Sequence, residues 1–590
     1  MVRWPAMIRD GGKTTRQPGH VIDFMPLTWM SPVSVTPLSS RVATVAPVSN
    51  SPTPIHCGSD GVSDRTQGNG IMRAFYSGLF ALFLLPCHVL AAVELSSLFS
   101  DHMVLQRDAA VPIWGRTDAG GTVTVSFASQ SVNAKANAQG EWRAELKPLD
   151  ASASPSSLVV QAGDSKVTVS NVLVGDIWVG SGQSNMAGRV GSYAKNDVTL
   201  AAATEKAPYP GIRLMQGGPK PTWSEATGQS ITQFSALHFA FGERLHRDLE
   251  VPIGLIVGAV GGTPSGSWIP PATYASSEKC KADVAAFGKS YNRAAAMRQY
   301  EARFAVWEKR VAAAKAKGEK PKGRKPAPPS GPGESTRGKI GRLYERFIEP
   351  VAGYRLRGVL WDQGESGTGV VGVGQHTMMS ELIRGWREAW GQGEFPFLFV
   401  QKPSGGGSAF SNDSPITRNG DPFAANLPDI TRSGSGKQRF LYVRLMQDNA
   451  NAWMVPASDL GSGIHPTNKW GYGNRAAEIA LSQIYKTGAQ AYGPTYKSHT
   501  IDGKQVVVTF IHAGQGLTAA HAAKLHGFAV AGPNGQWHWA EARIVGDTVV
   551  VWSDDVLTPT RVRYAWAQNR RWANLFNKDG LPALVFEAGE

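Results

Sequence analysis

Cysteine is scarce in this sequence. The chain of 590 residues holds only three, Cys57, Cys87 and Cys280. Three cysteines cannot build the disulfide framework that stabilises many small secreted domains. Stability must therefore come from buried apolar side chains, and the 42% hydrophobic and 9% aromatic content is that of a globular protein. The chain is too long for a single core, so we expect about two to four domains.

Two other features are missing. The sequence has no recognisable nucleic-acid-binding motif and no apolar run long enough for an ordinary membrane-spanning helix. The formal net charge of +14 would suit nucleic acid or an anionic surface. However, much of the excess lies in residues 309–339 and in the N-terminal region, and a solvated basic loop explains it better than a binding face. We predict no nucleic-acid partner and no stable membrane anchor.

Residues 72–92 have the form of a secretory signal peptide, with a basic start, a short apolar run and a small-residue cleavage site. Residues 1–71 are rich in Pro, Ser, Thr, Gly and Val without periodicity, so we predict disorder there and expect translation to begin at Met72. The mature protein would then start near Val93 and would be periplasmic or secreted. It would retain only Cys280, which excludes an intrachain disulfide.

Both flanks of the mature chain show the pattern of β-structure. Within residues 93–171, the segment 122–127 alternates apolar and polar side chains with period two. Within residues 488–590, the segments 505–510 and 548–552 are rich in valine. We predict a β-sandwich-like domain on each side of a central region.

The central region, residues 172–487, alternates short apolar runs with helical patterns. The expected strands are 177–179, 254–257, 357–361, 397–400 and 453–455, and the clearest helices are 234–249 and 378–390. This alternation predicts the α/β class, with a mostly parallel sheet and helices on both faces. An insertion at 279–341 interrupts it with a helix at 293–317 and a basic loop. Ligands of such sheets bind outside the carboxyl ends of the strands, where the polar turns should converge.

The first of these turns carries the candidate nucleophile, Ser184. Residues 182–186 read GQSNM directly after an apolar run, and Gly180 and Gly182 permit a tight turn. A helix that starts here would offer free N–H groups to an oxyanion beside the Ser184 hydroxyl. The residues alone leave a second interpretation open. Ser184 could simply cap a helix, and the segment is not the Gly-x-Ser-x-Gly nucleophile elbow.

The candidate base is His465. We expect a helix over roughly residues 468–486, and Pro466 suits the first position of a helix, so His465 would sit on the loop just before it. A surface histidine without a chemical role is the other interpretation of these residues.

Five separated motifs resemble those of the sialate O-acetylesterases and related carbohydrate acetylesterases, a branch of the SGNH-type hydrolases. They are LFSDHMVLQR at 98–107, GQSNM at 182–186, QGE at 363–365, IHPTNK at 464–469 and NLFNKDGLPA at 574–583. The resemblance spans about residues 93–590. It implies an SGNH/flavodoxin-like central domain and a serine esterase with Ser184 as nucleophile and His465 as base.

The resemblance leaves the third member of a triad open. SGNH enzymes often carry an aspartate three residues before the base, where this chain has Ser462. Asp459 lies six residues before His465 and is our candidate. The alternative is a backbone carbonyl that orients the imidazole.

An oxyanion hole is also implied, built from backbone N–H groups and one side-chain amide. Its predicted donors are the N–H of Ser184, the N–H of Gly261 or Gly262, and the side chain of Gln363. Glycine lets the main chain approach a substrate closely. We expect Asn185 and Glu365 to support the site by hydrogen bonding rather than to act on the substrate.

The expected activity is removal of O-acetyl groups from carbohydrate, most simply from sialic acid, without a metal or an organic cofactor. Asp362 stands where sialate esterases usually carry Tyr, and Gly367 where they usually carry Asn. These departures leave acetylated xylan or another polysaccharide open as substrate. A non-catalytic glycan-binding protein on the same scaffold is the second hypothesis, and the joint presence of Ser184, Gln363 and His465 argues against it. The sequence predicts no oligomeric state.

Overall fold

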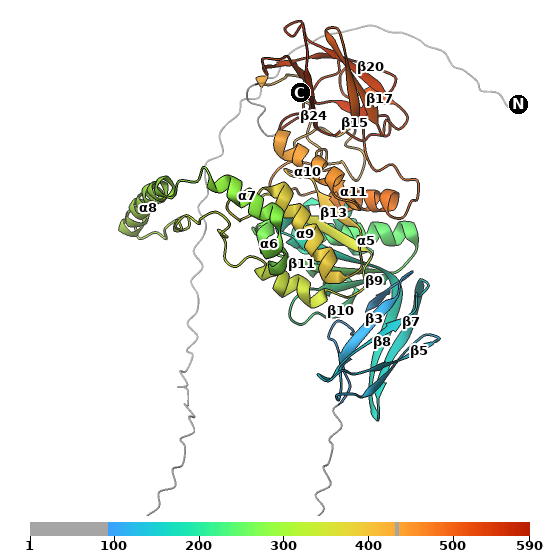
Figure 1. Ribbon diagram of the computed structural model, residues 1–590. Helices are drawn as coiled ribbons and strands as arrows, with labels where there is room; N and C mark the ends of the chain where they lie inside the picture. Colours follow the sequence, from blue (N-terminus) through green and yellow to red (C-terminus); the bar gives the residue numbers. More distant parts are fainter. Residues whose placement is uncertain (1–91, 431–435) are drawn as a thin grey trace, which may run out of the picture. The chain divides into compact units, whose positions relative to one another are not determined.

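The computed structural model describes residues 92–430 and 436–590 (Figure 1). The predicted disorder of residues 1–71 and the signal peptide, apart from Ala92, lie outside these ranges. Among the helices described, none combines the length and the apolar character needed to cross a membrane.

A large mixed sheet forms the centre of the fold. Its main path runs β10-β9-β11-β8-β12-β13-β14. The strands are β8 (Ser165–Gly182), β9 (Tyr209–Gln216), β10 (Trp223–Ala226), β11 (Ile253–Ala259), β12 (Gly358–Asp362), β13 (Phe397–Val400) and β14 (Ala452–Val455). Neighbours from β9 to β14 are parallel, and β10 pairs antiparallel at the edge. The predicted α/β arrangement is confirmed.

The order of the strands places a ligand site at one point. The chain enters the parallel sheet at β8, builds β9 and β11 on one side, and then crosses to build β12, β13 and β14 on the other. A sheet whose chain reverses direction in this way has a crevice beside the carboxyl end of the central strand. That strand is β8, and the residue two positions after its end is Ser184.

Helices cover both faces of the sheet. Trp178 of β8 packs edge-on against Phe241 of α5 (Ala236–Leu249), with ring centroids 4.9 Å apart. Trp361 of β12 packs edge-on against Trp386 of α9 (Gln375–Trp390), with centroids 5.8 Å apart. Trp178 is paired with Gly358, three residues before Trp361, so the two tryptophans point to opposite faces. Helix α11 (Lys469–Gln483) packs against α5, and α10 (Gly436–Asp448) packs against α9.

The N-terminal β part shares a strand with the central sheet. Its own strands are β1 (Glu94–Leu95), β2 (Val104–Gln106), β3 (Val111–Arg116), β4 (Thr122–Phe127), β5 (Gln130–Lys135), β6 (Glu141–Leu146) and β7 (Ser152–Ala162). The first half of β8 pairs with β7 and the second half with β11 and β12. The boundary expected at 171–172 therefore falls inside one continuous strand.

The C-terminal part forms further β-sheets around a separate apolar cluster. One sheet holds β15 (Thr495–Asp502), β16 (Gln505–Ile511), β21 (Thr548–Trp552) and β20 (Glu541–Val545). A second holds β19 (Trp537–Trp539), β18 (Phe528–Ala531), β22 (Arg561–Tyr564) and β24 (Phe586–Gly589). The pair β17 (Leu517–Ala519) and β23 (Leu575–Asn577) completes it.

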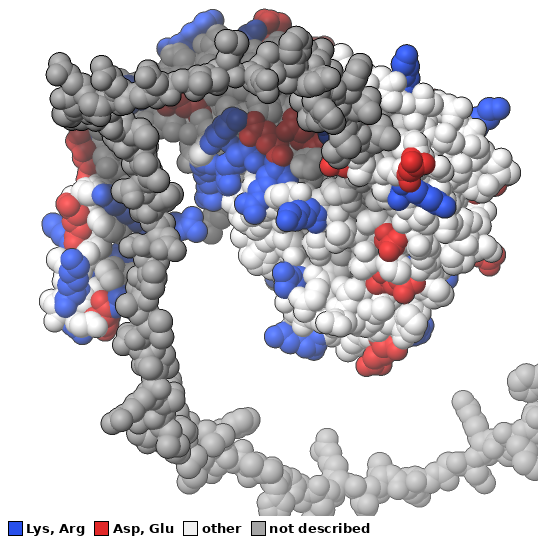
Figure 2. All heavy atoms as spheres, turned by 90° about the horizontal axis from the view of Figure 1, so that it is seen from below, with Lys and Arg blue, Asp and Glu red and all other residues white. Residues whose placement is uncertain are grey.

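The insertion after the third parallel strand is helical, as expected. It contains α7 (Glu278–Gly288) and α8 (Arg293–Ala316), and α8 extends away from the sheet without a buried residue (Figure 1). Cys280 is buried in α7 as a free thiol. On the face seen in Figure 2, basic side chains are mixed with acidic ones rather than forming a surface of one sign.

A buried carboxylate ties the N-terminal part to the sheet. Asp176 of β8 is fully buried and accepts hydrogen bonds from Gln106 Nε2 at 2.8 Å, Arg107 Nη2 at 3.0 Å and Arg357 Nε at 2.9 Å. Burial alone would raise the pKa of Asp176, but the Arg357 and Arg107 guanidiniums outweigh it and hold that pKa below its usual value. The carboxylate is therefore stabilising only in its ionised form.

We expect the variant Asp176→Asn to lower the free energy of unfolding by about 3 kcal/mol near neutral pH, because a buried ion pair loses one partner. A depressed folded-state pKa gives stability that is present above the unfolded value and lost as pH falls through the folded one. The gap between wild type and variant should therefore shrink below about pH 4. Urea unfolding across pH measures it, with the exposed turn variant Asp164→Asn as control. A gap that does not change with pH would contradict this account.

Candidate active site

Ser184 and His465 are brought together by the fold. Ser184 Oγ and His465 Nε2 lie 2.9 Å apart although the residues are 281 positions apart in the sequence. Ser184 is half-buried and begins the short helix α1 (Ser184–Ala187) directly after β8, while His465 is exposed on a loop. A serine hydroxyl in hydrogen-bond contact with an imidazole is the pair that nucleophilic catalysis requires.

Gly182 makes the turn before the serine possible. Its φ is +130°, and a Cβ there would stand 2.1 Å from the carbonyl oxygen of Asp362. The next amide, Gln183 N–H, donates to that same carbonyl at 2.9 Å. The ends of β8 and β12 thus meet too closely for any side chain, and only glycine fits.

The helix after His465 begins within one residue of its expected start. Helix α11 starts at Lys469, and Asn468 caps it by accepting from Gly471 N–H at 2.8 Å. Pro466, which suits the first position of a helix, instead lies two residues before the cap, because the asparagine side chain provides the stronger start signal. His465 still precedes the helix on a loop, with Pro466 in between.

Asp459 is not brought to His465. Its buried carboxylate accepts from Arg475 Nη1 at 3.2 Å and Nη2 at 2.9 Å. Across the part of the chain that the structure describes, no carboxylate contacts the His465 imidazole, whose one hydrogen bond goes to Ser184. In this geometry Asp459 ties the segment after β14 to the middle of α11 rather than completing a triad.

The predicted oxyanion donors divide into two groups. A Cβ on Gly261 would lie 3.6 Å from the Ser184 Cβ, so this main chain is beside the nucleophile. In the described ranges, the N–H groups of Gly261 and Gly262 have no hydrogen-bond partner and are free to donate. The Gln363 amide is buried and already donates to the Gly367 carbonyl at 3.0 Å. It holds a loop in place, and would have to give up that bond to reach an oxyanion.

A buried charged cluster lies behind Ser184. Glu365 accepts from Gln183 Nε2 at 2.7 Å and from Asn185 Nδ2 at 3.2 Å, so it holds the residues on either side of the serine. Lys402 Nζ contacts Glu365 at 2.8 Å and Asp362 at 2.5 Å. Burial alone would lower the pKa of Lys402, but the two carboxylates outweigh it and raise that pKa. The predicted supporting roles of Asn185 and Glu365 agree with these contacts.

Lys402 and Lys469 were not predicted as parts of the site. Lys402 lies two residues after the end of β13, and Lys469 begins α11; both are fully buried. Lys469 Nζ donates to Asn185 Oδ1 and to the Pro466 carbonyl, each at 2.7 Å. Burial lowers the pKa of Lys469 to about 7. The only sequence signal for Lys402 was its place at a strand end.

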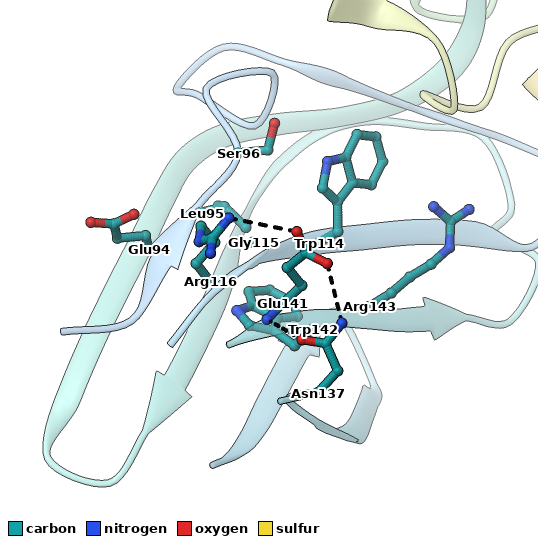
Figure 3. Close-up of a pocket in the computed structure, with 10 residues that line it drawn as sticks. All are labelled: Glu94, Leu95, Ser96, Trp114, Gly115, Arg116, Asn137, Glu141, Trp142 and Arg143. Atoms are coloured by element: carbon teal, nitrogen blue, oxygen red, sulfur yellow. Dashed lines mark hydrogen bonds and ion pairs between the residues drawn. The ribbon is translucent and has the colours of Figure 1, made fainter. Parts of the chain in front are cut away.

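A cleft of about 760 Å³ opens next to the loop that carries His465. Its walls come from Glu365, from Ser462, Gly463 and Ile464 just before the base, and from Gln568 and Asn569 of the C-terminal part. A second cavity of about 580 Å³, away from the pair, lies on β1, β3 and β6 (Figure 3). There Arg143 covers the Trp114 ring at 5.5 Å and Glu141 accepts from Asn137.

The arrangement defines a class. A serine beside a histidine, at the carboxyl end of the central strand of a parallel sheet with free glycine N–H groups next to it, is the arrangement of an α/β serine hydrolase.

The comparisons with known proteins agree with this class. Residues 174–303 match the model of a family described as "Carbohydrate esterase, sialic acid-specific acetylesterase". This part of the chain is therefore similar to that family, and the resemblance inferred from the motifs is confirmed.

Two curated relatives are both named sialate O-acetylesterase. The chain is 28% identical over 343 residues to the sialate O-acetylesterase of Rattus norvegicus, across 52% of this chain and 60% of that protein. It is 26% identical over 350 residues to the sialate O-acetylesterase of Homo sapiens, across 52% of this chain and 57% of that protein. The chain thus spans about 60% of the length of these relatives.

A solved structure covers more of the chain. A carbohydrate acetylesterase from Xanthomonas citri superposes with a TM-score of 0.64 at 26% identity, over 84% of this chain and 99% of that one. The mixed α/β architecture with additional β-sheets is therefore that of a carbohydrate esterase.

The position of Asp459 gives a prediction. In Asp459→Asn the buried Arg475 loses one of its two carboxylate partners and keeps Glu478, so we expect the free energy of unfolding to fall by about 3 kcal/mol while kcat of the folded variant stays near wild type. An aspartate that orients the catalytic imidazole would instead cost about 10⁴ in kcat. Hydrolysis of an aryl acetate, measured below the unfolding temperature, separates the two. Asp176→Asn, which breaks another buried ion pair, is the matched control. A loss of about 10⁴ in kcat that is seen in Asp459→Asn alone would show that Asp459 does orient the catalytic imidazole.

Proposed function

We propose that this chain is a serine esterase that removes O-acetyl groups from carbohydrate, with Ser184 as nucleophile and His465 as general base. The observation that carries the proposal is the 2.9 Å contact between Ser184 Oγ and His465 Nε2 beside free glycine N–H groups. The family match of residues 174–303 and the fold of the Xanthomonas citri carbohydrate acetylesterase support it.

The proposed reaction has two halves. Ser184 Oγ attacks the acetyl carbonyl carbon as His465 Nε2 takes the hydroxyl proton, and the N–H groups of Ser184 and Gly261 or Gly262 stabilise the oxyanion. The tetrahedral intermediate expels the sugar oxygen, which receives the proton from His465. Water then attacks the acetyl-enzyme, gives its proton to His465, and acetate leaves as Ser184 regains its hydrogen. None of these steps uses a metal or an organic cofactor.

The substrate we propose is an O-acetylated sialic acid, as in the names of the curated relatives. An acetylated xylan or another polysaccharide is the alternative, favoured by a cleft of about 760 Å³ that exceeds the needs of one acetyl group. We also propose an SGNH-type central domain, β-sandwich-like flanks, and a secreted or periplasmic location that rests on the signal-like residues 72–92.

Acetate release tests the proposal. Protein from Val93 onward should release acetate from at least one of O-acetylated sialic acid, acetylated xylan and an aryl acetate. Ser184→Ala should lose about 10³-fold or more in kcat, because the nucleophile is absent. Ser192→Ala, an exposed serine without a side-chain hydrogen bond, is the matched control. Full activity in Ser184→Ala would rule out the serine mechanism. Glycan binding without acetate release would favour the non-catalytic hypothesis.

The pH profile tests the base. A histidine accepts a proton only in its neutral form, so the rate should fall as pH drops from about 8 to about 4, across the range where an ordinary histidine becomes charged. Initial rates on an aryl acetate, with unfolding monitored at each pH, measure this. A flat profile over that range would argue against His465 as base.

A further inference from the structure

The loop that carries His465 has few other attachments. Residues 462–466 make no hydrogen bond between main-chain groups anywhere in the described chain. The loop begins with Gly461 and Gly463 at φ of +97° and +100°, and the Ile464 side chain is 66% exposed. Such a segment has no intrinsic reason to hold an imidazole in one place. With Asp459 engaged by Arg475, something else must do so.

Two buried side chains hold the peptide groups on either side of His465. Asn185 Nδ2 donates to the Ile464 carbonyl at 3.2 Å. Lys469 Nζ donates to the Pro466 carbonyl at 2.7 Å. These two side chains also bind each other, since Lys469 Nζ donates to Asn185 Oδ1 at 2.7 Å. Because Asn185 follows Ser184 directly, the same contacts that fix the base fix it relative to the nucleophile.

We propose that Lys469 and Asn185 form a clamp that orients His465 toward Ser184, and that it takes over the orienting part of the role that a triad carboxylate has in other serine hydrolases. This inference rests on the proposed function of the Ser184–His465 pair. Lys469 is fully buried and Asn185 is 2% exposed, so neither can touch a substrate in the cleft. Both are positioning residues.

Neighbouring side chains hold both residues of the clamp in place. Lys469 Nζ stands 4.5 Å from the centre of the Tyr193 ring, which favours a fixed ammonium by a cation–π contact. Asn185 Nδ2 also donates to Glu365, which Lys402 pairs. Donors and acceptors that are buried and satisfied in this way restrict motion more than exposed ones. The orientation of His465 thus derives from the buried charged cluster through Asn185.

The test uses labelling of Ser184 by a fluorophosphonate, which needs the serine–histidine pair but no sugar ester. We expect Lys469→Met, which keeps the length of the side chain without its donors, to label about 10²-fold more slowly, because a misplacement of about 1 Å costs this much. Asn185→Ala should lose a similar factor. The double variant should be no slower than either single one, since residues that act as a unit are not additive.

Further readouts separate positioning from instability. With an aryl acetate, the loss should appear in kcat with KM within about twofold of wild type. Lys469→Arg, which keeps donors for the Pro466 carbonyl, should recover part of the rate. Asp176→Asn, a destabilising variant far from the pair, should label at the wild-type rate. If Lys469→Met does not fold, Asn185→Ala alone decides.

Several results would overturn the clamp. One is a wild-type labelling rate in folded Lys469→Met or Asn185→Ala, and another is a double variant whose loss of rate is the product of the two single losses. The clamp also fails if Asp176→Asn loses as much rate as the clamp variants, or if the wild-type protein is not labelled at all. Normal labelling of the wild type together with no acetate release from any sugar would instead overturn the proposed function and leave the clamp standing.

Discussion

A buried lysine ammonium holds the mouth of the sheet together. Lys402 lies at the end of β13 and contacts Asp362 at the end of β12 and Glu365 in the turn beyond it. Glu365 in turn binds Gln183 and Asn185, the neighbours of the nucleophile. Removing one member of such a group leaves an unpaired charge in an apolar interior, at a cost of several kcal/mol. The position of Ser184 is therefore set by a charged network in which Lys402 and Asp362 are fully buried.

The parallel strands could be predicted from the sequence because burial on both faces demands continuous apolar side chains. Strands β8, β11, β12, β13 and β14 contain the expected runs. Strands β9 and β10 were not predicted, because their composition is mixed. Strand β9 contains Pro210, Gly211 and a buried Arg213, whose guanidinium donates to the Pro210 carbonyl and to Asn171. Tertiary hydrogen bonds that satisfy a buried arginine leave no mark on local periodicity.

The same distinction applies to the site. Ser184 and His465 carry local signals, a Gly-rich turn after a strand and a loop before a helix, and the motifs that surround them are specific. Lys402 carries no such signal, and Lys469 has only its place at the end of the IHPTNK motif, which does not mark it as buried because a lysine is usually exposed. The partner of Asp459 could not be foreseen, since Arg475 is reached only after the chain has passed the base and entered α11. The spacing in the sequence suggested that Asp459 contacts the His465 imidazole, but in the fold its partner is the Arg475 guanidinium.

Strand β8 is shared by the N-terminal β part and the central sheet. Its first half is paired with β7 and its second half with β11 and β12, without a linker between them. Recombination between genes exchanges modules at linkers, where few hydrogen bonds cross. Here an exchange of the N-terminal β part would have to cut the strand that delivers the serine. We therefore expect this part to share its ancestry with the nucleophile, whereas α7 and α8, an insertion between two strands, can be lost or replaced independently.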